Sequence, residues 1–304
     1  MKDIFKYITD YFKSLNSKVF LACSLLTALM IYLNFHYEID LKIDEFESIT
    51  IQFFCRYLLF LLAFALPYFF YFLFEGKNYF KSPLILLLIF LSPAIFSWKM
   101  EMSTDFHLSN NHYWNYYWNQ VAYWPVRLIV LSFILFIIWK IFYSKERFFG
   151  LTVMNFNWKP YLIMLLIMVP LIAAASTQPD FLSMYPKLKD VDTALYGVKN
   201  KWFYHLLHEL SYGTDFISVE LFFRGFLILA FVKVVGKDAI LPMACFYCAI
   251  HFGKPLGECI SSYFGGLILG IVVYNTRSII GGLIVHLGIA WLMELGGYIG
   301  NSLR

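Results

Sequence analysis

The sequence repeats long apolar runs, each close to the roughly 20 residues that a helix needs to cross a bilayer. The chain is 60% hydrophobic and 14% charged, whereas soluble domains are about 45–50% apolar and about 25% charged. A backbone in lipid must satisfy its own hydrogen bonds, so these runs predict helices. We therefore expect an all-α, polytopic helical membrane protein with about nine transmembrane helices, near residues 19–33, 51–74, 83–98, 125–143, 160–175, 214–235, 239–252, 260–274 and 279–299.

The charged residues lie mainly between the runs, where they bear on topology. Four lysines precede the run 19–33, which ends without a small-residue cleavage site, so we expect a retained first span and a cytoplasmic N-terminus. Basic residues between 140 and 159 support this orientation, and those between 187 and 201 oppose it. The net charge of +4 is modest for 304 residues, which indicates the lipid bilayer rather than nucleic acid as a partner.

The apolar runs change character near residue 200. Residues 1–200 hold bulky runs with few buried polar groups, and we expect a shell of N-terminal transmembrane helices there. Residues 201–304 are richer in small and ionisable side chains and predict a polar core. Gly266 and Gly270 have the spacing that permits close helix approach, and Gly282 lies one turn before His286.

Glu220 and Arg224 lie four residues apart inside an apolar run. On a helix they share a face and can neutralise each other. Ionisable residues within membrane helices are costly and usually paired, so they mark a functional-site candidate. For these two residues alone, a pair that only anchors neighbouring helices is a nearly equal explanation.

Two histidines in later apolar runs favour the functional interpretation. His251 and His286 could converge with the Glu–Arg pair on one water-filled cavity. A neutral imidazole accepts a proton, ligates a metal or donates to a developing oxyanion. A water activated in such a site could attack a peptide carbonyl.

The order of these residues resembles the CAAX protease and bacteriocin-processing (CPBP, or Abi) family of intramembrane endopeptidases. The family motifs are Glu-Glu-x-x-x-Arg, Phe-x-x-x-His and His-x-x-x-Asn, and the resemblance covers roughly residues 213–295. Glu220 and Arg224 match the second Glu and the Arg, while His251 and His286 match the two histidines. The resemblance implies that these four residues form the catalytic site of an endopeptidase related to the CAAX prenyl proteases.

Three motif positions depart from the family pattern. The first Glu is Val219, the Asn is Ala290, and the aromatic residue one turn before the second-motif histidine is Tyr247. Because valine cannot move a proton, the usual mechanism is not carried over intact. Asp215, Glu294 or the second Glu itself are alternative bases, and we favour interfacial solvation for the first two.

The resemblance also implies a cofactor, a substrate class and a location. The family is usually classed as metal-dependent, which implies a divalent metal such as zinc, although the residues do not identify its ligands. The implied partner is a membrane peptide or protein substrate, and the implied location is a prokaryotic plasma membrane that the chain crosses many times.

Two further groups resemble metal sites. His205 and His208 have an i, i+3 spacing, and we expect solvated side chains there. Cys245, Cys248 and His251 are spread around one helix, which favours packing, because a zinc site usually brings a second ligand pair. All five cysteines lie in or beside apolar runs, so a disulfide framework is not expected.

Two other functions stay open. A catalytically inactive relative that binds a peptide or lipid would explain Val219 and Ala290. A proton-coupled transporter would also use buried ionisable groups, but transporters commonly show two related halves. The polar residues here gather at one end of the sequence, so the transporter ranks last.

Overall fold

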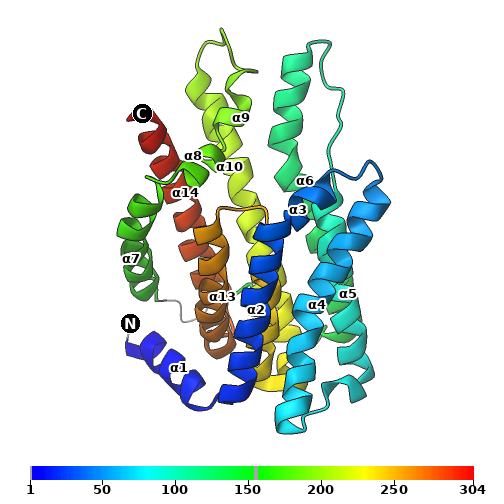
Figure 1. Cartoon of the computed structure of the whole chain (residues 1–304). Coiled ribbons are helices and arrows are strands. Elements are labelled where there is room, and N and C mark those ends of the chain that lie inside the picture. The colour runs from blue at the N-terminus through cyan, green and yellow to red at the C-terminus, as the bar shows by residue number, and fades with distance from the viewer. Residues whose placement is uncertain (1, 154–156) are drawn as a thin grey trace. The chain divides into compact units, whose positions relative to one another are not determined.

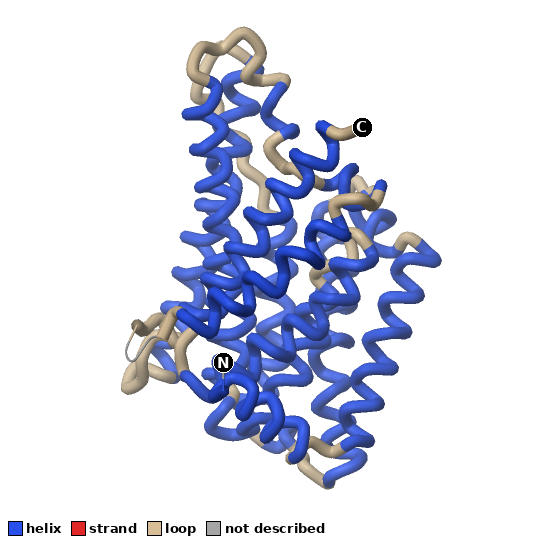
Figure 2. The backbone as a smooth tube through the Cα atoms, turned by 90° about the vertical axis from the view of Figure 1, so that its left-hand side faces the viewer, coloured by secondary structure: helices blue, strands red, loops and turns tan. Residues whose placement is uncertain are grey.

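The computed structural model describes residues 2–153 and 157–304. These residues form helices and loops without a strand among them, which confirms the all-α fold class (Figures 1 and 2). Their contacts divide the chain into two units. Unit 1 comprises residues 1–101, 145–152 and 222–279, and unit 2 comprises residues 102–144, 153–221 and 280–304. Each unit combines early and late segments, so the expected division at residue 200 stays a prediction about sequence character.

Unit 1 contains most of the short helices as well as four long ones. Its elements are α1 (Lys2–Lys13), α2 (Ser17–Tyr37), α3 (Ile39–Asp44), α4 (Ile49–Glu75), η1 (Tyr79–Lys81), α5 (Pro83–Glu101), the larger part of η2 (Glu220–Ala230), α11 (Val232–Val235), η3 (Gly236–Ala239), α12 (Ile240–Ala249) and α13 (Leu256–Thr276). Unit 2 contains α6 (His112–Phe142), α7 (Lys159–Ala175), α8 (Pro179–Met184), α9 (Lys189–Asp192), α10 (Lys201–Val219) and α14 (Ile280–Ser302).

The core of unit 1 forms around α12. All ten of its residues are buried, as expected for a helix that is apolar on every side. It packs against α2, α4 and α13, and the Phe246 ring lies 5.1 Å from Phe60 and 5.6 Å from Phe64 on α4. A Cβ atom added to Gly266 on α13 would lie 3.1 Å from the Tyr247 ring. The predicted close approach at Gly266 is therefore confirmed.

Unit 2 is built on α10 and α14, which carry its polar residues. Helix α6 packs along α10, and α14 packs against α7, α8 and α10. Glycines on α14 allow these contacts, since a Cβ atom added to Gly288 would meet Leu165 at 2.7 Å, and one added to Gly281 would overlap Tyr161. The small residues of the last run therefore serve close helix packing.

Six helices among the described residues are long and apolar enough to cross a membrane: α2, α4, α5, α6, α13 and α14. A seventh is counted if α7 and the segment Pro179–Asp192, bent by 98°, form one broken span. The chain is thus a multi-pass membrane protein with fewer such helices than the nine expected. The run 239–252 forms the ten-residue α12, which at a rise of about 1.5 Å per residue is too short to cross.

The run 214–235 differs in another way. Its helix continues from α10 into η2, an 11-residue π-helix that begins at Glu220. Its backbone hydrogen bonds therefore join residues five apart instead of four. The plain α-helix expected through Glu220 and Arg224 is wrong in this respect. π-Helical turns occur frequently at functional sites.

Candidate functional site

Glu220 and His286 form a hydrogen-bonded pair inside unit 2. Glu220 is the first residue of η2, His286 lies on α14, and the Glu220 Oε1 atom is 2.9 Å from His286 Nδ1. The Glu220 side chain is fully buried and that of His286 is 13% exposed. With Glu220 ionised, the carboxylate can only accept, so Nδ1 donates and Nε2 keeps its lone pair. Two of the four residues that were expected to converge are therefore in contact.

Two neighbours fix the geometry of this pair. A Cβ atom added to Gly282 would lie 2.7 Å from Glu220 Oε2, so the glycine provides the space that the carboxylate occupies. The Phe216 ring on α10 meets the His286 ring edge-on, with 4.8 Å between centroids. The carboxylate and the imidazole therefore sit against a glycine and an aromatic ring, which restricts their rotation.

Arg224, Tyr247 and His251 form a second group, within unit 1. The Arg224 Cζ atom lies 3.8 Å from the centre of the Tyr247 ring, a cation–π distance. The centroids of Tyr247 and His251 are 4.6 Å apart, and His251 Nδ1 lies 2.8 Å from the Tyr247 carbonyl oxygen. A carbonyl oxygen only accepts, so Nδ1 carries the proton and Nε2 has a lone pair. Tyr247 thus contacts both predicted site residues of this group.

The four predicted residues therefore occur in two groups: Glu220 contacts His286, and Tyr247 contacts both Arg224 and His251. In each group the imidazole is oriented through its Nδ1 atom. The convergence of the four residues on one cavity, and the neutralisation of Glu220 by Arg224, stay predictions.

Two of the positions that differ from the family motifs carry apolar, buried side chains. Val219 ends α10 with 7% exposure, and Ala290 on α14 is 3% exposed. Neither can exchange a proton. Asp215 lies one turn before Val219, is half-buried, and accepts a hydrogen bond of 3.0 Å from Ser218 Oγ.

Glu294 was expected to be solvated, and this expectation is wrong. Its side chain is buried, and its oxygens accept hydrogen bonds from the backbone N–H groups of Lys187, at 2.9 Å, and Leu188, at 3.3 Å. It is also hydrogen-bonded to Glu209 on α10. Burial, followed by the charge of Glu294, raises the pKa of Glu209 to about 8. This acid pair joins α10, α14 and the segment after α8.

His208 was also expected to be solvated, and it is fully buried instead. It lies against the Trp124 ring on α6, with 5.3 Å between centroids. Burial, followed by the charge of His205, lowers the pKa of His208 to about 4. His205 is partly exposed and its Nε2 atom lies 3.0 Å from Asp192 Oδ1. Sequence spacing alone did not distinguish these two environments.

A metal ion needs several ligand side chains close together. Across the described parts of the chain, no three His, Cys, Asp or Glu side chains gather closely enough to hold a metal ion. All five cysteines are free thiols, and Cys248 Sγ donates to the Cys259 carbonyl oxygen at 3.3 Å. Four of the five, all but Cys55, are buried, in keeping with the packing interpretation. No metal ligand set is assigned here.

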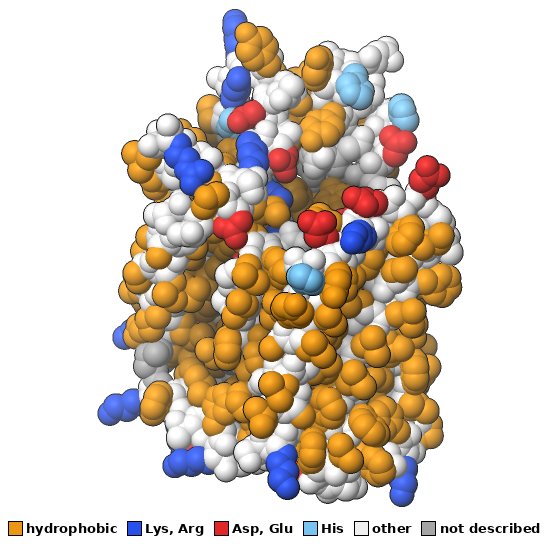
Figure 3. Space-filling model, in the orientation of Figure 1, with side chains coloured by type: hydrophobic (Ala, Val, Ile, Leu, Met, Phe, Trp, Pro, Cys, Tyr) orange, Lys and Arg blue, Asp and Glu red, His pale blue; other side chains and the backbone are white. Residues whose placement is uncertain are grey.

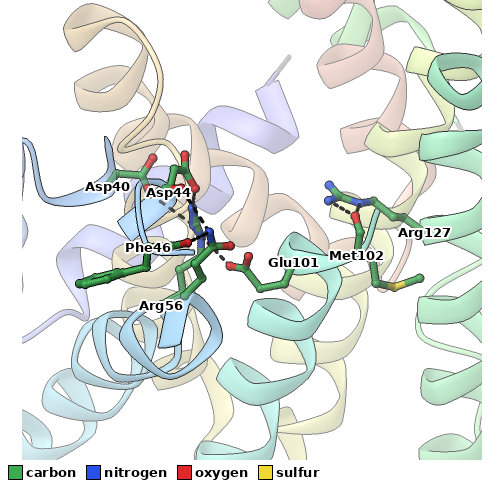
Figure 4. Close-up of polar contacts among 8 residues, drawn as sticks. Asp40, Asp44, Phe46, Arg56, Glu101, Met102 and Arg127 are labelled. Atoms are coloured by element: carbon green, nitrogen blue, oxygen red, sulfur yellow. Dashed lines mark hydrogen bonds and ion pairs between the residues drawn. The ribbon is translucent and has the colours of Figure 1, made fainter. Parts of the chain in front are cut away.

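A buried ion cluster in unit 1 was missed by the sequence interpretation (Figure 4). Arg56 on α4 is 4% exposed and contacts three carboxylates, those of Asp44, Asp40 at 3.8 Å, and Glu101 at 3.1 Å. The first runs were expected to hold few buried polar groups, and Arg56 corrects that expectation. The signal was present, because a single arginine in an apolar run stands near the acidic segment 38–48.

A cavity in unit 1 lies away from the predicted residues. It has a volume of about 570 Å³ between α2 and α13, and its lining is mostly apolar, with Ser24, Tyr32, His36 and Tyr263 among its residues. None of the four predicted site residues lines it. The hydrogen-bonded pair of Glu220 and His286, rather than this cavity, therefore identifies the candidate site.

Comparison with known proteins links part of the chain to a family model. Residues 214–292 match the family model described as type II CAAX prenyl endopeptidase Rce1-like. This segment contains Glu220, Arg224, His251 and His286, so the predicted resemblance to the CAAX protease family is confirmed over it. No curated protein and no solved structure matches the chain.

Proposed function

We propose that the chain is an intramembrane endopeptidase of the CAAX protease-like type, which hydrolyses peptide bonds in membrane-bound substrates. The observation that carries the proposal is the fully buried Glu220 carboxylate held against His286 Nδ1 at 2.9 Å. A carboxylate in this position orients the imidazole and stabilises its protonated form. The pair thereby supplies a base although Val219 replaces the first family carboxylate.

The proposed reaction begins with a water beside His286 Nε2. The imidazole takes a proton from this water while the oxygen attacks the peptide carbonyl carbon. The tetrahedral intermediate collapses as the C–N bond breaks, and the imidazolium returns the proton to the leaving nitrogen. Glu220 acts as the positioning residue in both steps.

The second group has a supporting role in this proposal. The Tyr247 carbonyl oxygen accepts a hydrogen bond from His251 Nδ1, and the Tyr247 ring contacts both His251 and Arg224. Tyr247 thereby orients the His251 imidazole within unit 1. A divalent metal at the site stays a prediction from the family resemblance, and metal analysis of the purified protein tests it.

The direct test is cleavage of a membrane peptide library by the full chain purified in detergent. We expect cleavage by the parent protein and its loss in the double variant His251→Ala/His286→Ala. Glu220→Gln should reduce cleavage strongly, because a neutral amide does not stabilise the imidazolium. The matched control is His36→Ala, an exposed histidine on α2. Cleavage that persists in the double variant would refute the assignment.

The second candidate is a catalytically inactive relative that binds a peptide or lipid. The buried apolar side chains at Val219 and Ala290 favour it. The discriminating variant is Val219→Glu, which restores the family carboxylate. Proteolysis that appears only in this variant would establish the inactive state of the parent. A proton-coupled transporter also stays a prediction, and proton flux in liposomes tests it. The location in the plasma membrane of a prokaryote stays a prediction that localisation of the protein tests.

A further inference from the structure

Helix α1 lies on unit 1 as a separate short helix before the first membrane span. It packs against α13 and buries Ile4 and Tyr11. The turn that joins it to α2 is held by Lys237, whose Nζ atom donates to the Ser14 carbonyl oxygen at 2.6 Å. Figure 1 shows that α1 runs at a steep angle to α2. Its orientation on unit 1 is therefore fixed by packing and by a hydrogen bond at its end.

The outward sides of α1 divide into an aromatic line and a basic line. Phe5 is 71% exposed and Phe12 is 42% exposed, and their spacing of seven residues places them on one line along the helix. Lys2, Lys6 and Lys13 are exposed as well, with spacings of four and seven. At 3.6 residues per turn the lysine line lies roughly 90° around the helix from the phenylalanine line.

The two aspartates of α1 lie on a third side of the helix. Asp3 and Asp10 are exposed and lie about 70° beyond the lysines, on the side away from the phenylalanines. Around its circumference α1 thus presents the protein body, then aromatic rings, then ammonium groups, then carboxylates. A helix lying in a membrane interface meets hydrocarbon, headgroups and water in this same order.

Basic side chains also lie close to α1. Lys18 follows at the start of α2 and is exposed. On the face shown in Figure 3, the charged side chains along the lower end, where α1 lies, are mainly lysine and arginine, whereas basic and acidic side chains are mixed near α3. Lysines close to a leaflet surface attract anionic lipid headgroups.

We propose that α1 is an in-plane membrane anchor, with Phe5 and Phe12 in the acyl region and Lys2, Lys6 and Lys13 bound to anionic phospholipid headgroups of one leaflet. This surface is distinct from the Glu220–His286 pair and does not depend on the proposed peptidase activity. The occupant follows from charge complementarity, because the basic line borders the only two exposed phenylalanines of α1.

The test is amide hydrogen exchange of residues 2–13 in the full chain reconstituted in nanodiscs. One set contains phosphatidylcholine alone, and the other contains one part phosphatidylglycerol to two parts phosphatidylcholine. We expect exchange roughly tenfold slower with phosphatidylglycerol, an effect that high salt removes. The variant Lys2→Gln/Lys6→Gln/Lys13→Gln should lose the difference, while the control Lys42→Gln, on α3, should keep it.

A second variant separates the aromatic contribution. Phe5→Ser/Phe12→Ser should speed exchange in both kinds of nanodisc, because acyl contacts do not depend on headgroup charge. Equal exchange in the two lipid compositions for the parent chain would overturn the proposal. Exchange that follows the number of protein copies per disc instead of lipid charge would identify the surface as a contact between copies, and would also overturn it.

Discussion

Gly282→Ala is the most direct perturbation of the Glu220–His286 pair. The added Cβ atom would lie 2.7 Å from Glu220 Oε2, whereas ordinary contact begins at 3.4 Å, so the oxygen must move by about 0.7 Å. Glu220 is fully buried and its other oxygen is bound to His286, so the movement disturbs the pair. A misplacement of about 1 Å can lower a rate by about a hundredfold, and overpacking of a core costs about 1–3 kcal/mol of stability.

We therefore expect Gly282→Ala to lower peptide cleavage by roughly tenfold to a hundredfold and to lower the midpoint of thermal unfolding in detergent. The matched control is Gly265→Ala on α13, because no atom lies within 4 Å of its added Cβ atom. The control should keep full activity and gain up to about 1 kcal/mol of helix stability. If both variants behave alike in activity and unfolding, the assigned position of the Glu220 carboxylate is wrong.

Three further predictions concern charges outside the pair. Burial raises the pKa of Glu209 to about 8. The contribution of this side chain to the free energy of unfolding is therefore complete below the unfolded pKa of about 4.3 and is lost as pH rises towards 8. Glu209→Gln, which still donates to Glu294, should make the unfolding temperature less dependent on pH over this range in thermal unfolding scans. The pKa of His208 is lowered to about 4 by burial, so its contribution should fall from about pH 6.5 towards 4, and His208→Phe should remove that acid limb from the same scans. Arg56→Met should destabilise by about 1–3 kcal/mol, since it leaves the partly buried carboxylates of Asp40 and Glu101 without their cation. Chemical unfolding should show a larger loss than for Lys42→Met, an exposed control.

Apolar run length and residue type predicted the helical membrane fold and singled out Glu220 and His286, two residues that the structure brings into contact. The same reasoning explained Gly282, a small residue one turn before a histidine, which the structure places against the carboxylate. These features depend on local spacing and on the high cost of leaving a charge alone in lipid. Both can be judged from a single sequence.

Other features depend on partners that local spacing does not reveal. Glu294 is buried because the backbone N–H groups after α8 reach its oxygens, and a backbone donor leaves no mark in residue type. His208 is buried because α6 brings Trp124 against it. The π-helix at Glu220 is a change of hydrogen-bond register, to which side-chain hydropathy is insensitive. Each case requires knowledge of which helix lies opposite.

In the proposed peptidase, the position of α12 determines where a substrate meets His251. Ten helical residues extend about 15 Å, half of the roughly 30 Å hydrocarbon thickness, so α12 covers only part of the membrane depth. Just after it, the Phe252 carbonyl oxygen accepts a hydrogen bond of 3.0 Å from Asn34 Nδ2, three residues before the end of span α2. His251 therefore lies at the depth where α2 ends, near one membrane surface. In the proposed reaction, substrates with a chain end or a weak helix close to that surface would be preferred over continuous, stable transmembrane helices.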